Sequence, residues 1–100
     1  MIDFKHINNA ALGYLPSILS RWLPDGKQRG HEYISRNPKR GDKTPGSFKI
    51  NLNKGCWSDF ATGDKGGDVI SLAAYLFDLR QYEAAKKLSE MLGIGMDYAA

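Results

Sequence analysis

The sequence predicts an α+β domain: a small antiparallel sheet of about three strands packed with an N-terminal helical segment and two C-terminal helices. Three observations carry this prediction. Apolar residues recur every three or four positions over residues 8–23, alternate with polar ones in the middle of the chain, and return to helical spacing after residue 67. With 100 residues, of which 42% are hydrophobic and 25% charged, we expect one globular domain over residues 1–100.

The helical segment expected over 8–23 contains Pro16, which lacks the backbone N–H that a helix interior requires. We therefore expect a kink, or two short helices with Pro16 in the first turn of the second. The sequence Pro24-Asp25-Gly26 predicts the turn that ends the segment. The inward face is formed by Ala11, Leu12, Leu15, Ile18, Leu19 and Trp22.

The sheet is expected over 31–60, with strands at 31–36, 47–52 and 56–60 and a loop over 37–46. On the last strand, alternation places Phe60 on one face and Trp57 on the other. We expect Phe60 to be buried against Phe48 and Ile50. Trp57 would then be exposed beside basic residues, with Tyr33 nearby. Burial of Trp57 beneath the N-terminal helices is an equally weighted alternative from the residues alone.

The glycine-rich loop expected over 61–67 leads into a helix over 68–78 with Asp68 as its N-cap, and a second helix is expected over 81–92. Gly93 is the expected C-cap, and the tail 94–100 is expected to fray. A helix start of this kind can bind anions. The loop lacks the Walker A pattern, however, so we favour a tight turn that shapes the sheet edge.

Several functional classes find no support in the composition. No apolar run reaches the roughly 20 residues of a membrane span, and the start has no signal-peptide pattern. The single cysteine, Cys56, excludes an internal disulfide and suits a reducing cytoplasm. Cys56, His6 and His31 lack the paired spacing of a zinc site, and we expect no metal or cofactor. Asp68 is expected to cap a helix and Asp64 to lie in a turn. We therefore expect no magnesium site among the carboxylates of Asp59, Asp64 and Asp68.

The charge is concentrated in the middle of the chain. Between Arg21 and Lys54 there are nine basic and three acidic residues, although the net charge of the whole chain is +3. A basic segment between more acidic ends predicts one face with a positive potential, suited to a polyanion. The alternative is a solvated loop region that is basic by chance.

Two stretches, residues 42–51 and 57–72, resemble the zinc-ribbon domain at the N-terminus of bacterial, phage and plasmid DNA primases. The resemblance rests on Lys43-Thr44-Pro45 followed by Ser47-Phe48, and on Gly66-Gly67-Asp68-Val69-Ile70. Gly46 is an insertion in the family pattern. All four metal ligands of that pattern are missing: Asn37 replaces the first Cys, Arg40 the His, and Phe60 and Gly63 the second Cys pair.

The resemblance implies a cytoplasmic, non-catalytic module of a phage- or plasmid-like primase or primase-helicase, with nucleotidyl transfer in a separate domain or protein. It implies single-stranded template DNA and a polymerase or helicase domain as partners, and neither a membrane nor a small-molecule substrate. The alternatives are a docking module that contacts a polymerase or helicase domain, and a free-standing regulator of a replication protein. The candidate DNA-binding residues are Arg36, Lys39, Arg40, Lys43, Lys49, Trp57 and Lys65.

Overall fold

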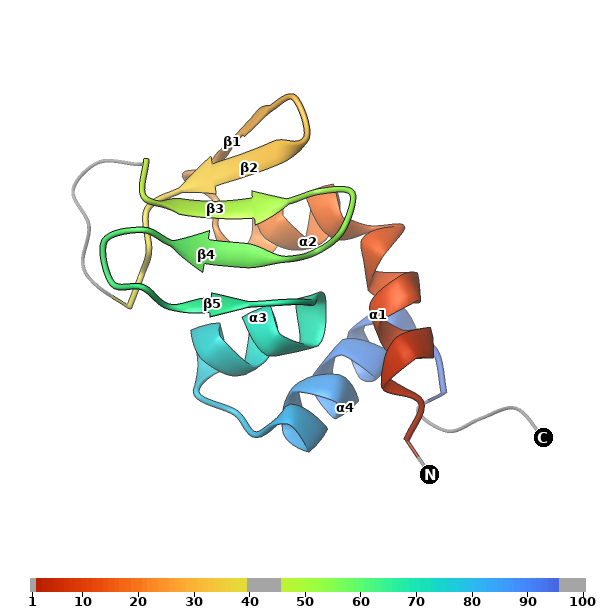
Figure 1. The fold of residues 1–100 in the computed structure, drawn as a ribbon. Helices are drawn as coiled ribbons and strands as arrows, with labels where there is room; N and C mark the ends of the chain where they lie inside the picture. The colour runs from red at the N-terminus through yellow and green to blue at the C-terminus, as the bar shows by residue number, and fades with distance from the viewer. Residues whose placement is uncertain (1, 40–45, 96–100) are drawn as a thin grey trace.

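The computed structural model describes residues 2–39 and 46–95 of the chain. Within these residues the fold is α+β, as predicted, but the sheet has five strands rather than three (Figure 1). In chain order the elements are α1 (Phe4–Leu12), α2 (Leu15–Trp22), β1 (Lys27–Arg29), β2 (Glu32–Ser35), β3 (Phe48–Asn51), β4 (Trp57–Asp59), β5 (Lys65–Gly66), α3 (Val69–Phe77) and α4 (Gln81–Leu92).

The N-terminal segment forms two helices because Pro16 can occupy only the first turn of a helix without losing a hydrogen bond. The first helix begins at Phe4, earlier than residue 8, because the Asp3 carboxylate accepts a 3.0 Å hydrogen bond from the His6 N–H. This N-cap lies outside the apolar pattern from which the helix was predicted. The α2 helix then ends at the turn through Pro24 and Gly26.

The sheet is an antiparallel meander in which each strand pairs with the next along the chain. The two strands that the sequence did not predict are its edges. The three residues of β1 are all polar and exposed, so they show no alternation. The two residues of β5 lie inside the segment expected to be a glycine-rich turn, where Lys65 pairs with Ser58 and Gly66 with Trp57.

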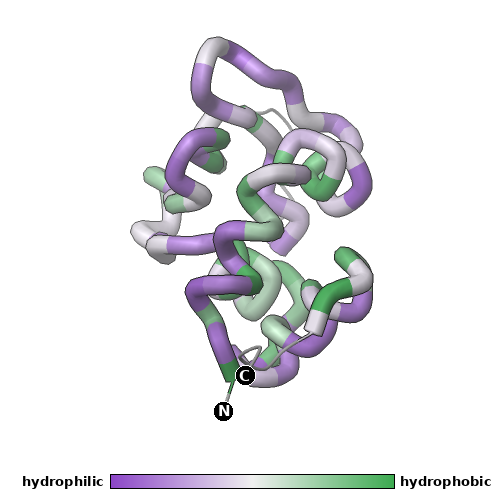
Figure 2. The backbone as a smooth tube through the Cα atoms, turned by 90° about the vertical axis from the view of Figure 1, so that its right-hand side faces the viewer, coloured by the Kyte–Doolittle hydropathy of each residue, from purple (hydrophilic) through white to green (hydrophobic). Residues whose placement is uncertain are grey.

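One face of the sheet is buried and the other is open. The buried side chains Tyr33, Phe48, Ile50 and Trp57 share a core with the apolar residues of the helices. In Figure 1 the described helices lie behind, beside or below the sheet, with α2 passing behind it. Figure 2 shows that the tip of the β1–β2 hairpin, at the top of the view, is hydrophilic.

The strand-to-helix connection explains the first of the two glycines before α3. The Trp57 Nε1 donates a 2.9 Å hydrogen bond to the Ser71 hydroxyl, and Ser71 forms a capping box with Asp68 at the start of α3. A Cβ on Gly66 would lie 2.4 Å from the Trp57 Nε1 and 2.3 Å from the Ser71 Oγ. Glycine at position 66 therefore allows the sheet edge, the indole and the helix start to meet.

Among the residues described, no helix is long and apolar enough to cross a lipid bilayer.

Candidate nucleic-acid interface

A row of side chains crosses the open face of the sheet. The strand registers place Lys27 opposite Ile34, Ile34 opposite Lys49, Lys49 opposite Ser58, and Ser58 opposite Lys65. Residues directly opposite one another in adjacent strands project from the same face, and neighbouring strands lie about 4.8 Å apart. This face therefore carries a lysine on each edge strand and a third on the central strand.

An exposed aromatic ring lies beside this row. Phe60 follows the end of β4, and 73% of its surface is exposed. Its N–H donates a 3.0 Å hydrogen bond to the Ser47 carbonyl, which continues the β3–β4 pairing by one residue pair. The Lys49 Nζ lies 5.6 Å from the centroid of the Phe60 ring, within cation–π range. Lys49 thus connects the aromatic ring with the row of lysines.

The open face contains two adjoining hollows that share Lys49. The larger, of about 630 Å³, extends over β2 to β5, and the smaller, of about 370 Å³, lies over β1 to β3. The larger is lined by Glu32, Lys49, Asn51, Cys56, Trp57, Ser58, Lys65, Gly66 and Gly67. The smaller is lined by Lys27, Arg29, Ile34, Gly46 and Lys49. Glu32 is the one acidic residue among these lining residues, so the face has a positive balance.

The cations of this face differ from two other candidate basic residues. Arg36 forms an ion pair with Asp25, and Lys39 forms one with Asp78 at the end of α3. No ion pair is found for Lys27, Lys49 or Lys65 within the part of the chain that the structure describes. Cations without a carboxylate partner among the described residues are available to phosphate groups, and the release of counterions from the nucleic acid favours that binding at low salt.

The candidate DNA-binding residues therefore differ in how available they are to phosphate. Lys49 and Lys65 lie on the open face, whereas Arg36 and Lys39 are engaged in ion pairs. Arg40 and Lys43 lie outside the described residues.

The expected exposure of Trp57 and burial of Phe60 were both wrong. Trp57 is 6% exposed, and its ring lies 4.6 Å from that of Tyr75 and 6.0 Å from that of Phe48. Asp59 takes the inward position next along the strand, because buried hydrogen bonds satisfy its carboxylate. The prediction gave that position to Phe60 on hydrophobicity alone. Tyr33, expected near the exposed Trp57, is also buried, and its hydroxyl donates a 2.7 Å hydrogen bond to the Leu23 carbonyl.

Three residues of this face were missed by the sequence reasoning: Lys27, Arg29 and Phe60. The signal for the two cations was the Lys27-Gln28-Arg29 run before the Gly30 turn, which is typical of a polar edge strand. No sequence pattern indicated that Phe60 is exposed. The preceding residue, Asp59, is buried, so alternation along the strand turns Phe60 to the open face.

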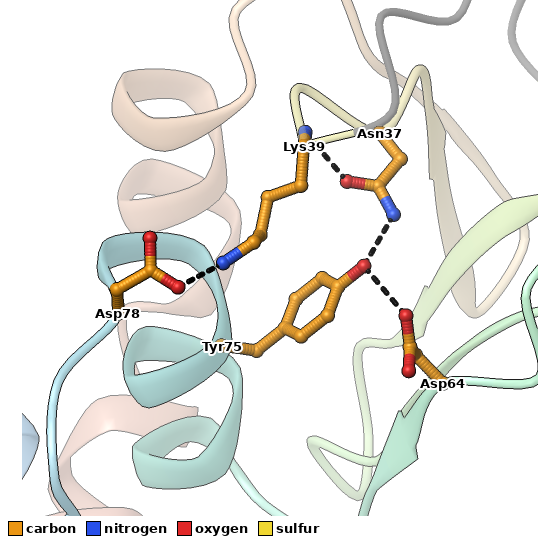
Figure 3. A network of polar contacts seen from close by, with 5 residues as sticks. All are labelled: Asn37, Lys39, Asp64, Tyr75 and Asp78. Atoms are coloured by element: carbon orange, nitrogen blue, oxygen red, sulfur yellow. Dashed lines mark hydrogen bonds and ion pairs between the residues drawn. The ribbon is translucent and has the colours of Figure 1, made fainter.

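A second polar site lies where β2 and β4 end and β5 begins, at the positions that the primase resemblance gives to the missing metal ligands (Figure 3). Asn37 is fully buried, and its Nδ2 donates hydrogen bonds of 2.8 Å to Asp59 Oδ2 and 2.7 Å to Tyr75 Oη. The Tyr75 hydroxyl donates a 3.0 Å hydrogen bond to Asp64. The Asn37 Oδ1 accepts a 2.9 Å hydrogen bond from the Lys39 N–H.

This polar site does not fit a zinc ion. Zinc in ribbons is held by thiolates and imidazoles, whereas Asn37 offers an amide whose nitrogen is already a donor. Phe60 points to solvent, Gly63 has no side chain, and Arg40 lies outside the described residues. No group of three potential metal-binding side chains occurs in residues 2–39 and 46–95. Burial, together with nearby Asp64 and Asp59, raises the pKa of Tyr75 and keeps its phenol protonated, although its hydrogen bond with Asn37 opposes the shift.

The antiparallel meander, the polar site at the ligand positions and the Gly-Gly-Asp start of α3 define a domain of the zinc-ribbon type. The family model described as CHC2 zinc finger matches residues 17–100, and the chain therefore belongs to that family. Its fold is similar to a crystal structure of the Aquifex aeolicus primase comprising the zinc-binding and RNA polymerase domains, with a TM-score of 0.73 and 26% identity.

That match covers 91% of this chain and 22% of the primase chain, so this domain spans about a fifth of the solved protein. No curated protein matches the sequence.

Proposed function

We propose that this primase-type domain binds single-stranded template DNA through the open face of its sheet. The observation that carries the proposal is the row containing Lys27, Lys49 and Lys65, with the exposed Phe60 ring beside it. Domains that hold single strands combine cations that follow the phosphates with aromatic rings on which bases stack. Both components occur here on one face. In this proposal the domain positions the template, and nucleotidyl transfer takes place in a separate domain or protein.

The proposed contact set differs from the one expected from the sequence. Lys49 and Lys65 remain in it, and Phe60 replaces Trp57 as the stacking platform because Trp57 is buried. Lys27 and Arg29 join it from β1, beside the smaller hollow. Arg36 and Lys39 have carboxylate partners, so DNA would have to compete with Asp25 and Asp78 for them.

A second candidate function is docking of the same face onto a polymerase or helicase domain. The exposed Phe60 and half-buried Ile34 favour it, because apolar side chains surrounded by polar ones are typical of protein interfaces. The two functions differ in their response to salt. Phosphate binding weakens steeply as salt rises, whereas an apolar contact does not.

The test is a fluorescence anisotropy titration of the purified domain with a labelled oligo(dT) strand at about 50 and about 200 mM salt. The proposal expects binding at the lower salt that weakens markedly at the higher. An unlabelled duplex of the same length, added as competitor, reports the preference for single strands. Absence of binding at the lower salt would overturn the proposal and favour docking.

A further inference from the structure

We propose that a cluster of hydrogen-bonded side chains does in this chain what a bound zinc ion does in a zinc ribbon. The cluster, called here the polar staple, consists of Asn37, Asp59, Asp64 and Tyr75. It ties the loop after β2 to the turn between β4 and β5 and adds a connection to α3 (Figure 3). This inference concerns how the fold is held together and does not depend on DNA binding.

The staple spans the two chain segments that a zinc ion would join. Asn37 occupies the position of the first Cys, while Asp59 and Asp64 flank positions 60 and 63 of the second pair. The backbone closes the same turn: the Gly63 N–H donates a 2.8 Å hydrogen bond to the Asp59 carbonyl. The Asp59 N–H donates one of 2.8 Å to the Asp64 carbonyl. The frame of the metal site is therefore preserved while its chemistry has changed.

The staple resists opening because its central groups are buried. Asn37 is 0% and Asp59 1% exposed, and the Asp59 Oδ1 also accepts a 2.8 Å hydrogen bond from the Ala61 N–H. Removing one partner would leave a buried donor or acceptor unsatisfied, which costs more than an exposed hydrogen bond contributes. Hydrogen bonds to a carboxylate are also stronger than those between neutral groups.

Tyr75 anchors the staple to the hydrophobic core. It comes from α3, and its ring packs against Trp57 and Phe48 at centroid distances of 4.6 and 6.2 Å. The Lys39 Nζ lies 5.1 Å from the centroid of the same ring. The loop after β2, the turn before β5 and helix α3 therefore meet at the Tyr75 hydroxyl group. Removing this hydroxyl is the most direct test of the staple.

The first test is a double-mutant cycle of Asn37→Ala and Tyr75→Phe, measured by urea unfolding. Tyr75→Phe removes one oxygen and keeps the ring, so the variant is expected to fold. Its unfolding constant should rise about tenfold, and the effects of the two substitutions should not multiply, because both remove the same 2.7 Å hydrogen bond. The control is Tyr82→Phe, since Tyr82 is exposed on α4. Equal effects of Tyr75→Phe and Tyr82→Phe, or fully multiplicative effects, would overturn the inference.

The second test measures metal directly in wild-type protein. Elemental analysis should find far less than one zinc per chain, and the melting temperature should be the same with and without excess chelator. One zinc per chain, together with a large fall in melting temperature on chelation, would overturn the inference. This readout is independent of DNA, so its failure would leave the proposed DNA binding open to its own test.

Discussion

The Trp57 indole donates its hydrogen bond to the Ser71 hydroxyl, and Gly66 lies directly against both groups. One side chain thus connects the sheet, the edge strand β5 and the capping box of α3. Trp57 pairs with Ile50 on one side and Gly66 on the other, so its burial fixes the facing of β3, β4 and β5 together. The facing of Lys49 and Lys65 on the open side follows from the burial of this indole.

Gly66→Ala should destabilise the domain by about 1–3 kcal/mol, the usual cost of overpacking a core. The new Cβ would lie within 2.4 Å of the Trp57 ring and the Ser71 hydroxyl, and neither can move without breaking their hydrogen bond. Gly67→Ala is the matched control, since a Cβ there meets nothing within 4 Å. Urea unfolding of the two variants measures the difference. Equal stabilities would show that the indole is not held as described.

Phe60→Ala should leave stability within about 0.5 kcal/mol of wild type, because the ring is mostly exposed. In contrast, it should weaken single-stranded DNA binding by roughly 1–3 kcal/mol, the value of one aromatic stacking platform. Thermal melts and the anisotropy titration measure the two effects separately. A loss of stability of several kcal/mol would place Phe60 in the core after all. Unchanged DNA affinity would remove it from the interface.

Much of the architecture could be predicted because its elements leave periodic patterns. The α+β class, the break at Pro16 and the helical spacing after Asp68 all follow from residue spacing and from residues with restricted backbones. The edge strands could not be predicted in this way. A strand of three exposed polar residues and one of two residues have no apolar alternation, and only pairing with a neighbour makes them strands.

Part of the candidate site was also predicted: the facing of β3 was correct, whereas the facing of β4 was wrong. Lys49 projects from the open face of β3, because it alternates with the buried Phe48 and Ile50. The sequence pattern indicated this facing correctly. The facing of β4 depended on whether Phe60 or Asp59 was buried, and hydropathy favours Phe60. The buried Asp59 is satisfied by Asn37, which lies 22 positions away in the sequence. Such a long-range polar partner cannot be recognised from the local sequence pattern. The prediction therefore exposed Trp57 and buried Phe60, which is the reverse of the structure.

Lys49→Ala and Lys65→Ala should each weaken DNA binding similarly for all base sequences. Each should also reduce the slope of log K against log salt by about 0.7, the value for one phosphate contact on a single strand. Lys86→Ala is the control, because Lys86 is exposed on α4, away from the sheet. Titrations at three or more salt concentrations give the slopes. If Lys86→Ala lowers the slope as much as Lys49→Ala does, binding is nonspecific and the open face is not the interface.

Stability should fall in alkaline solution more steeply in wild type than in Tyr75→Phe. Burial raises the pKa of Tyr75 and of Tyr33 above the ordinary value of 10.0, so the folded state holds these protons more tightly than the unfolded state. The stability linked to each phenol is therefore complete below pH 10 and is lost as pH rises through the folded-state pKa.

Urea unfolding at about pH 9 and about pH 11 measures the loss. Tyr75→Phe should lose less than wild type over this interval. Identical losses in the two proteins would mean that Tyr75 ionises as freely in the folded chain as in the unfolded one.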